Sequence, residues 1–194
     1  MERRTVMMAA AAAAAAATSL ALLSGCTTNK GASETPAQRM AAINTGVDAT
    51  LATLYSSVPG SRELAAKSTG ILVFPKIYAA GLGVGGEYGE GALKVGRTTV
   101  GYYRTSSLTW GFQAGAQSKA LVMMFMTQEA LDKFRSSSGW TAGADASVAV
   151  IKSGAQATVD TASARSAVNA FALTNAGLMA GVTIDGTKVS KLDF

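Results

Sequence analysis

The sequence predicts an α+β fold in which N-terminal helices precede a strongly bent or barrel-like, mainly antiparallel sheet with one inserted helix. Three observations lead to this prediction. Apolar residues between Met40 and Val58 recur at three- and four-residue steps, as they do on one face of a helix. From Ile71 onward the chain consists of short apolar or alternating segments, which are typical of strands. Residues 81–101 contain eight glycines, and glycines permit the sharp bends of a curled sheet.

Helices are predicted at the start of the folded region and once within the sheet. The first ends at Pro59-Gly60, because proline and glycine both interrupt a helix. Ser61 can act as the N-cap of a short second helix from Arg62 to about Ser68. Thr127 can cap the inserted helix, which runs from Gln128 to about Arg135.

The predicted strands are short and closely spaced. Ile71-Leu72-Val73-Phe74 forms an apolar strand that Pro75 ends. Leu121 to Met126 is an unbroken apolar run, which we interpret as a strand buried on both faces. The other predicted strands are Leu93–Val95 and Thr98–Arg104 across a turn at Gly96-Arg97, Trp110–Ala116, Val148–Ile151, Asn169–Thr174, and a final hairpin of Val182–Ile184 with Lys188–Val189 around Asp185-Gly186.

The first 25 residues have the pattern of an export signal. Arg3 and Arg4 precede an apolar run from Met7 to about Leu23, which is too short and too rich in alanine for a transmembrane helix. Leu23-Ser24-Gly25-Cys26 resembles the lipobox of bacterial lipoproteins. An ordinary secretory signal is the alternative, and the Arg3-Arg4 pair leaves both general and twin-arginine export open. We therefore expect a lipoprotein signal peptide at 1–25, a lipidated tether at 26–36 and one folded domain at 37–194.

The resemblance to lipoproteins implies where the protein resides. The Cys26 thiol is the nucleophile that takes a diacylglyceryl group, and palmitate would be incorporated. One acyl chain binds a membrane only marginally, whereas two or three make the attachment durable. Thr27, the residue after the cysteine, is not aspartate, which by resemblance to sorting in enteric bacteria favours the outer membrane. The expected location is the cell envelope, anchored by lipid, facing the periplasm or the cell surface.

Composition excludes several classes of function. The chain has no histidine and a single cysteine, so Ser-His and Cys-His nucleophile pairs and the usual zinc sites are not available. We therefore expect that the protein is not an enzyme and that it binds no metal ion or cofactor. Cleavage before Cys26 removes two of the 17 basic and one of the 12 acidic residues, which leaves a net charge of +4. That charge favours anionic surfaces, while the absence of Lys/Arg runs argues against nucleic acid. A hydrolase that uses carboxylates stays open as an alternative, although no two of the candidate carboxylates stand at a recognised catalytic spacing. These carboxylates are Glu87, Glu90, Asp145, Asp160 and Asp185.

Two local features have both a functional and a structural interpretation. Gly81 to Gly86 matches the spacing of a dinucleotide-binding loop, but the residues that follow, Glu87 to Gly91, do not begin a helix. We interpret these glycines as a bend or a close approach of backbones. Trp140 either lies at a membrane interface or packs, partly buried, on the inserted helix.

Four blocks of the sequence stand out: Lys67–Lys76, Gly81–Gly91, Trp110–Gln117 with Leu121–Met124, and Gly177–Val182. In this order they resemble the signatures of the SYLF domain, a lipid-binding domain. The resemblance covers roughly residues 37–194.

The resemblance implies binding of membrane phospholipid through basic residues. Eukaryotic members bind phosphoinositides and some fungal members associate with actin, but no actin is expected beside an exported bacterial protein. We expect a membrane-anchored lipoprotein whose domain binds anionic headgroups. The alternative is a structural or interaction lipoprotein with an envelope protein partner and no lipid ligand of its own. The candidate headgroup-binding residues are Lys67, Lys76, Lys119, Arg39 and Arg104.

Overall fold

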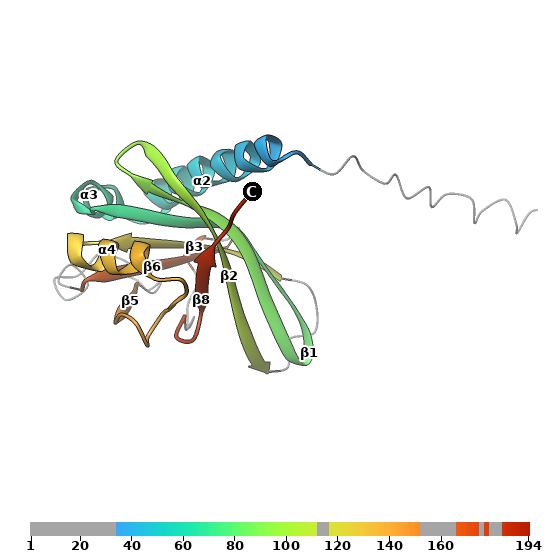
Figure 1. Cartoon of the computed structure of the whole chain (residues 1–194). Coiled ribbons are helices and arrows are strands. Elements are labelled where there is room, and N and C mark those ends of the chain that lie inside the picture. Colours follow the sequence, from blue (N-terminus) through green and yellow to red (C-terminus); the bar gives the residue numbers. More distant parts are fainter. Residues whose placement is uncertain (1–33, 112–116, 152–165, 175–176, 179–183) are drawn as a thin grey trace, which may run out of the picture. The chain divides into compact units, whose positions relative to one another are not determined.

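The computed structural model describes residues 34–111, 117–151, 166–174, 177–178 and 184–194 (Figure 1). The chain divides into two units, residues 1–35 and 36–194. The predicted signal peptide and Cys26 lie outside the described residues. Within the described part of the second unit, three helices and eight strands form the predicted α+β fold.

The helices α2 (Pro36–Ser57), α3 (Ser61–Lys67) and α4 (Gln128–Ser136) lie where the sequence predicts helices. In α2 the apolar stripe is buried, with Val47 and Leu54 fully inaccessible to solvent. This periodic burial is what stabilises a helix that lies on a sheet. Among the described helices, none is both long and apolar enough to cross a membrane.

The two shorter helices begin in different ways. Thr127 caps α4 as predicted, because its hydroxyl oxygen accepts a hydrogen bond from the Ala130 amide at 3.2 Å. The predicted N-cap role of Ser61 is wrong. Gly60 occupies the cap position with a φ of 79°, and Ser61 is the first residue of α3. The Ser61 hydroxyl instead donates to the Val58 carbonyl at 2.6 Å, and so joins the end of α2 to the start of α3.

The strands form one curled sheet in the order β4-β8-β2-β1-β3-β6-β5, with β7 paired to β6. Strands β5 and β6 are parallel, and the other described pairs are antiparallel. The sheet is therefore mainly antiparallel, as predicted. The strands are β1 (Gly70–Val95), β2 (Thr98–Gly111), β3 (Gln117–Phe125), β4 (Trp140–Thr141), β5 (Val148–Ile151), β6 (Val168–Thr174), β7 (Gly177–Leu178) and β8 (Lys188–Lys191).

Strand β1 is far longer than predicted and doubles back on itself (Figure 1). Its first part, residues 70–79, pairs with β3, and its second part, residues 83–95, pairs with β2. The two parts are in contact, because a Cβ atom at Gly89 would lie 2.8 Å from the Lys76 carbonyl oxygen. Gly89 thus permits the two parts of the strand to approach closely.

Pro75 does not end the first strand, contrary to prediction. The strand continues through it, and the pairing with β3 shifts register between Phe74 and Ile77. Proline has no backbone N–H to donate, and such an irregularity in the ladder is a place where a sheet tolerates it. Lys76 lies in the same irregular stretch.

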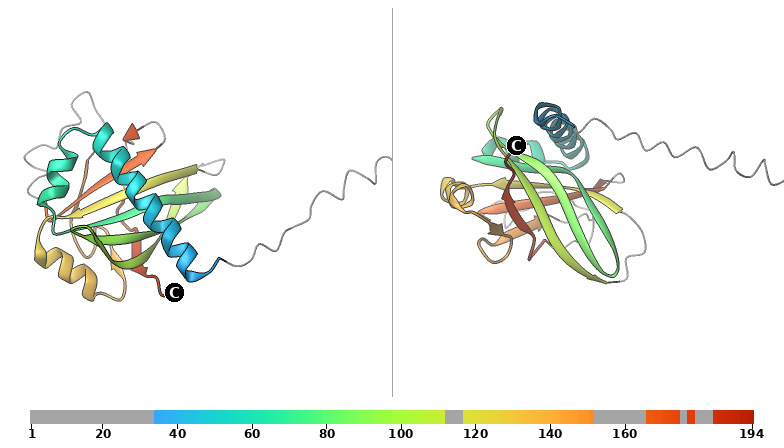
Figure 2. Two further views of the ribbon diagram at one scale, coloured as in Figure 1. Left: turned by 90° about the horizontal axis from the view of Figure 1, so that it is seen from above. Right: turned by 45° about the vertical axis from the view of Figure 1, so that its right-hand side comes forward.

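The sheet carries a hydrophobic core on each face, and β3 contributes to both. Leu121, Met123 and Phe125 belong to one cluster, which includes residues of α4. Val122 and Met124 belong to the other, which includes residues of α2 and α3. The predicted burial of this strand on both faces is confirmed. Figure 2 shows α2, in blue, running across the strands on one face of the sheet.

Trp140 is a core residue. It is 1% exposed, and its ring centroid lies 5.6 Å from that of Phe134 in α4 and 6.4 Å from that of Phe125. The membrane-interface interpretation of this tryptophan is therefore wrong, because an aromatic ring enclosed by other rings presents nothing to a bilayer.

The last predicted hairpin is described only in part. Its turn is present, since the Thr187 amide donates to the Ile184 carbonyl at 3.0 Å and Gly186 has a φ of 80°. Residues 182–183 lie outside the described residues, as do residues 112–116 of the predicted strand Trp110–Ala116. The described partners of β8 are β2 and β4.

Candidate functional site: a cleft between helix α2 and the sheet

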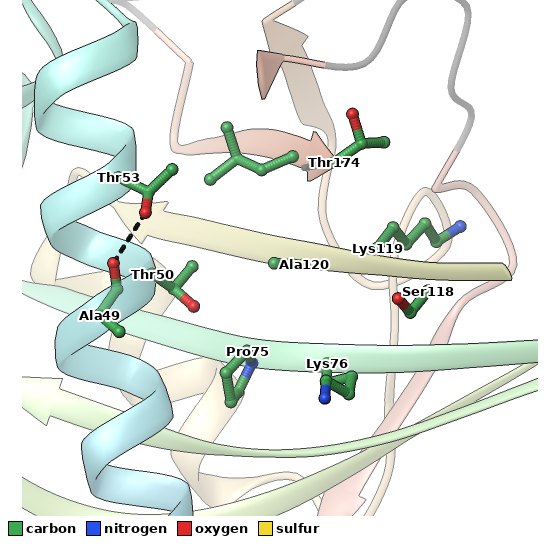
Figure 3. A pocket seen from close by; sticks show the side chains of 10 residues that line it. Ala49, Thr50, Thr53, Pro75, Lys76, Ser118, Lys119, Ala120 and Thr174 are labelled. Carbon is green, nitrogen blue, oxygen red and sulfur yellow. Dashed lines mark hydrogen bonds between the residues drawn. The ribbon is translucent and has the colours of Figure 1, made fainter. Parts of the chain in front are cut away.

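A cleft of about 320 Å³ lies between α2 and the neighbouring strands (Figure 3). Helix α2 forms one wall, and strands β1, β3 and β6 supply the rest. The cleft combines two lysines with several hydroxyl groups. It is lined by Ala49, Thr50, Thr53, Pro75, Lys76, Ser118, Lys119, Ala120, Leu173 and Thr174.

Lys76 is the solvent-exposed cation of this cleft. Its ammonium nitrogen lies 5.8 Å from the centre of the Tyr78 ring, a cation–π distance. No described carboxylate forms an ion pair with it. The irregular pairing after Pro75 places Lys76 at the cleft, so the local break in the ladder positions the charge.

Lys119 lines the same cleft but is already paired. Its ammonium donates to the Glu87 carboxylate at 2.8 Å, and the two side chains are only 16% and 10% exposed. The other Glu87 oxygen accepts a hydrogen bond from the Ser107 hydroxyl at 3.1 Å. These contacts join β3, β1 and β2, and they neutralise Lys119, which leaves Lys76 as the stronger attraction for an anion.

The hydroxyl groups of the cleft differ in what they can donate. Thr50 donates to the Gly46 carbonyl at 2.8 Å, and Thr53 donates to the Ala49 carbonyl at 3.0 Å. Both threonine protons are therefore used within α2, and only acceptor capacity remains on these oxygens. Ser118 is exposed on β3, opposite Tyr78. Its hydroxyl and the Lys76 ammonium are the groups best placed to bind an anion.

Two other candidate residues, Arg39 and Arg104, gather beside Tyr88. Arg39 pairs with Glu90 through both carboxylate oxygens, and the Tyr88 hydroxyl donates to the same carboxylate at 2.6 Å. The hydrogen bond from Arg39 is the main reason that the pKa of Glu90 lies below its ordinary value. Partial burial, more than the nearby carboxylate, raises the pKa of Tyr88. Arg104 lies opposite Glu90 in the β1–β2 ladder, and its guanidinium donates to the Ser190 hydroxyl at 3.1 Å.

Lys67 stands apart from both groups, exposed in the last turn of α3. The structure thus places Lys76 and Lys119 at the cleft and Arg39 and Arg104 near Glu90. The sequence did not indicate Ser118 or the pairing role of Glu87, because these depend on which strands become neighbours. Among the described residues, no group of three carboxylate or cysteine side chains could hold a metal ion.

Comparison with known proteins concerns the second half of the chain. Residues 106–193 match the Ysc84 family model, described as Las17-binding protein actin regulator. No curated protein matches the chain. The match includes Lys119 and two of the four sequence blocks, Trp110–Gln117 with Leu121–Met124 and Gly177–Val182. Over residues 106–193, this match supports the resemblance noted in the sequence and is consistent with a SYLF domain.

Proposed function

We propose that the protein is a lipoprotein of the cell envelope whose SYLF domain binds anionic phospholipid headgroups at the cleft beside α2. The SYLF family is a lipid-binding one, which supports the general class of ligand. The observation that carries the finer proposal is Lys76, an exposed lysine without a described carboxylate partner, at the edge of a hydroxyl-lined cleft.

The mechanism is electrostatic recognition with a few directed hydrogen bonds. The Lys76 ammonium carries three N–H donors, and Ser118 supplies one O–H donor from the adjacent strand. A lipid phosphate offers acceptor oxygens to both. Each basic residue near an anionic surface contributes about 1 kcal/mol, and salt weakens that contribution.

Vesicle sedimentation with the chain beginning at Thr27 tests whether the cleft binds anionic headgroups. We expect the wild type to prefer phosphatidylglycerol-containing vesicles over pure phosphatidylcholine at low salt. Lys76→Gln should weaken that preference about fivefold, the size of one basic contact. Lys133→Gln, which removes an exposed lysine from α4, is the matched control and should change it little. Equal binding of the wild type to both vesicles would overturn the proposal.

The anchor is the second part of the proposal. Its support is the Leu23-Ser24-Gly25-Cys26 sequence after a charged and then apolar segment. The proposed location is the outer membrane, facing the periplasm or the cell surface. We expect full-length protein to incorporate radioactive palmitate, and Cys26→Ser to abolish both the label and recovery with membranes. An unlabelled wild type, released from cells in the same way as the variant, would refute the anchor.

A protein partner is a second candidate function, favoured by the family description, which names a protein ligand, Las17. In that case the domain would act as an interaction lipoprotein without catalytic activity. Crosslinking in intact cells followed by mass spectrometry tests it. One stoichiometric partner, combined with no preference for anionic vesicles, would favour this candidate over lipid binding.

A further inference from the structure

We propose that the surface around the first turn of α2 docks on the membrane, with Tyr88, Leu108 and Phe194 entering the headgroup region between Arg39 and Arg104. We call these five residues the docking face. The inference rests on the proposed function, because it assumes that the domain works beside a bilayer. It adds which side of the domain faces the lipid.

The docking face holds apolar side chains that the fold leaves in water. Leu108 is 77% exposed, and Tyr88 and Phe194 are each 44% exposed. Tyr88 pairs with Ser106 and Leu108 pairs with Gly86, so Tyr88 and Leu108 are diagonal neighbours on the same face of the β1–β2 ladder. Gly86 has no side chain to cover the leucine. A single exposed leucine is common, but Tyr88 and Leu108 lie next to each other, and contiguous exposed apolar side chains are a feature of interaction surfaces.

Phe194 is connected to Tyr88 through contacts of Glu90 and Arg39. Glu90 accepts hydrogen bonds from Tyr88 and Arg39, and the Arg39 guanidinium lies 5.6 Å from the centre of the Phe194 ring. Arg104 faces Glu90 across the strands. Arg39 and Arg104 lie beside Glu90, so the apolar side chains are flanked by charged groups that can stay hydrated at a membrane surface. Neighbouring tyrosine, arginine and leucine side chains are well adapted to a membrane–water interface. Their rings and aliphatic parts can enter the headgroup region while their charged groups remain hydrated.

The length of the proposed tether agrees with this orientation. Helix α2 begins at Pro36, only three residues before Arg39. Ten residue steps separate Pro36 from Cys26, and a fully extended segment of that length spans at most about 35 Å. An anchor at Cys26 therefore keeps the first turn of α2 within that distance of the bilayer, whereas no such limit applies directly to α4.

The docking face and the cleft would have separate tasks. The cleft uses α2 from Ala49 to Thr53, which lies roughly 15 Å along the helix from Arg39 at 1.5 Å per residue. The cleft selects anionic headgroups, and its contribution is lost in salt. The apolar part of the docking face resists salt, because burial of hydrocarbon does not depend on charge.

The orientation is tested with the chain beginning at Thr27, which keeps both hydrophobic cores and has no cysteine. An N-terminal hexahistidine tag binds it to nickel-chelating lipid in phosphatidylcholine/phosphatidylglycerol vesicles, so that the readout does not depend on lipidation. Leu108→Cys then carries the only thiol, to which an environment-sensitive fluorophore is attached. Asp132→Cys in α4, an exposed position away from the docking face, is the matched control.

We expect brominated lipids to quench the fluorophore at position 108 and to leave that at position 132 unchanged. Equal quenching at the two positions, or none at 108, would overturn the docking face. Neither result bears on the cleft, whose test is the anionic preference that Lys76→Gln removes. Quenching at 108 without any anionic preference would support the docking face and contradict headgroup binding at the cleft.

An unlabelled variant gives an independent check. Tyr88→Ser combined with Leu108→Ser should weaken high-salt binding of the untagged chain to vesicles by about tenfold, as expected for keeping one leucine-sized side chain out of an apolar phase. Val100→Ser, at an equally exposed site near the β1–β2 turn, is the control. Unchanged binding of the double variant would contradict the proposal.

Discussion

At the residue scale, charged side chains in this domain mainly hold elements together. Lys119 and Glu87 illustrate this, because they form a largely buried pair that also binds Ser107. Removing one partner of such a pair leaves a desolvated charge, which costs more than the pair itself contributes. Lys94 and Asp48 form a more exposed pair, with Asp48 65% exposed, and solvent screening reduces its importance.

We therefore predict that Lys119→Met lowers the free energy of unfolding by about 3 kcal/mol, the lower end for an uncompensated charge in a broken buried pair. Urea denaturation measures it. The double variant Lys119→Met with Glu87→Gln should recover most of that loss, because the orphaned carboxylate is gone. Lys94→Met is the control and should cost under about 1 kcal/mol. Equal losses in both single variants would contradict the assignment.

A second residue-scale prediction concerns Glu90. Its folded-state pKa is lowered, chiefly by the hydrogen bond from Arg39. The stability that this carboxylate contributes is therefore complete above the ordinary glutamate pKa, and it is lost as pH falls through the folded-state value. We expect the wild type to exceed Glu90→Gln in stability at pH 6, with the gap closing as the solution is acidified. Urea titrations across that range measure it. A gap that widens in acid would reverse the sign and refute the argument.

At the element scale, the doubled strand β1 depends on glycines where its two parts touch. A Cβ atom at Gly91 would overlap the Val73 carbonyl oxygen and approach the Phe74 ring. Gly96 differs, because it has open space around it but a φ of 60° in the β1–β2 turn. The first position is restricted by neighbours and the second by its own backbone.

We predict that Gly91→Ala destabilises the domain by about 3 kcal/mol, because backbone atoms cannot move aside as a side chain can. Gly96→Ala should cost only about 1 kcal/mol, the penalty for alanine in the left-handed region. Thermal unfolding of the two variants in parallel provides the comparison. A larger loss at Gly96 than at Gly91 would show that the two parts of β1 do not approach as closely as described.

At the scale of the whole domain, one sheet with a core on each face supports helices on both sides. Covering the sheet in this way leaves the cleft along the middle of α2 and the docking face at its start. The same helix therefore supplies a wall of the proposed headgroup site and the connection to the proposed anchor. The proposed tether would limit how far the start of α2 lies from the bilayer.

The fold class, the three helices and the burial of β3 on both faces could be predicted from the amino-acid sequence alone, since these follow chiefly from local periodicity. The sequence also placed the β1–β2 turn at Gly96-Arg97. Three outcomes could not be predicted in this way: Pro75 lies within a strand, Trp140 is buried, and Lys119 is paired while Lys76 is exposed. Those outcomes depend on which distant segments become neighbours, and residue periodicity carries no information about partners far apart in the chain.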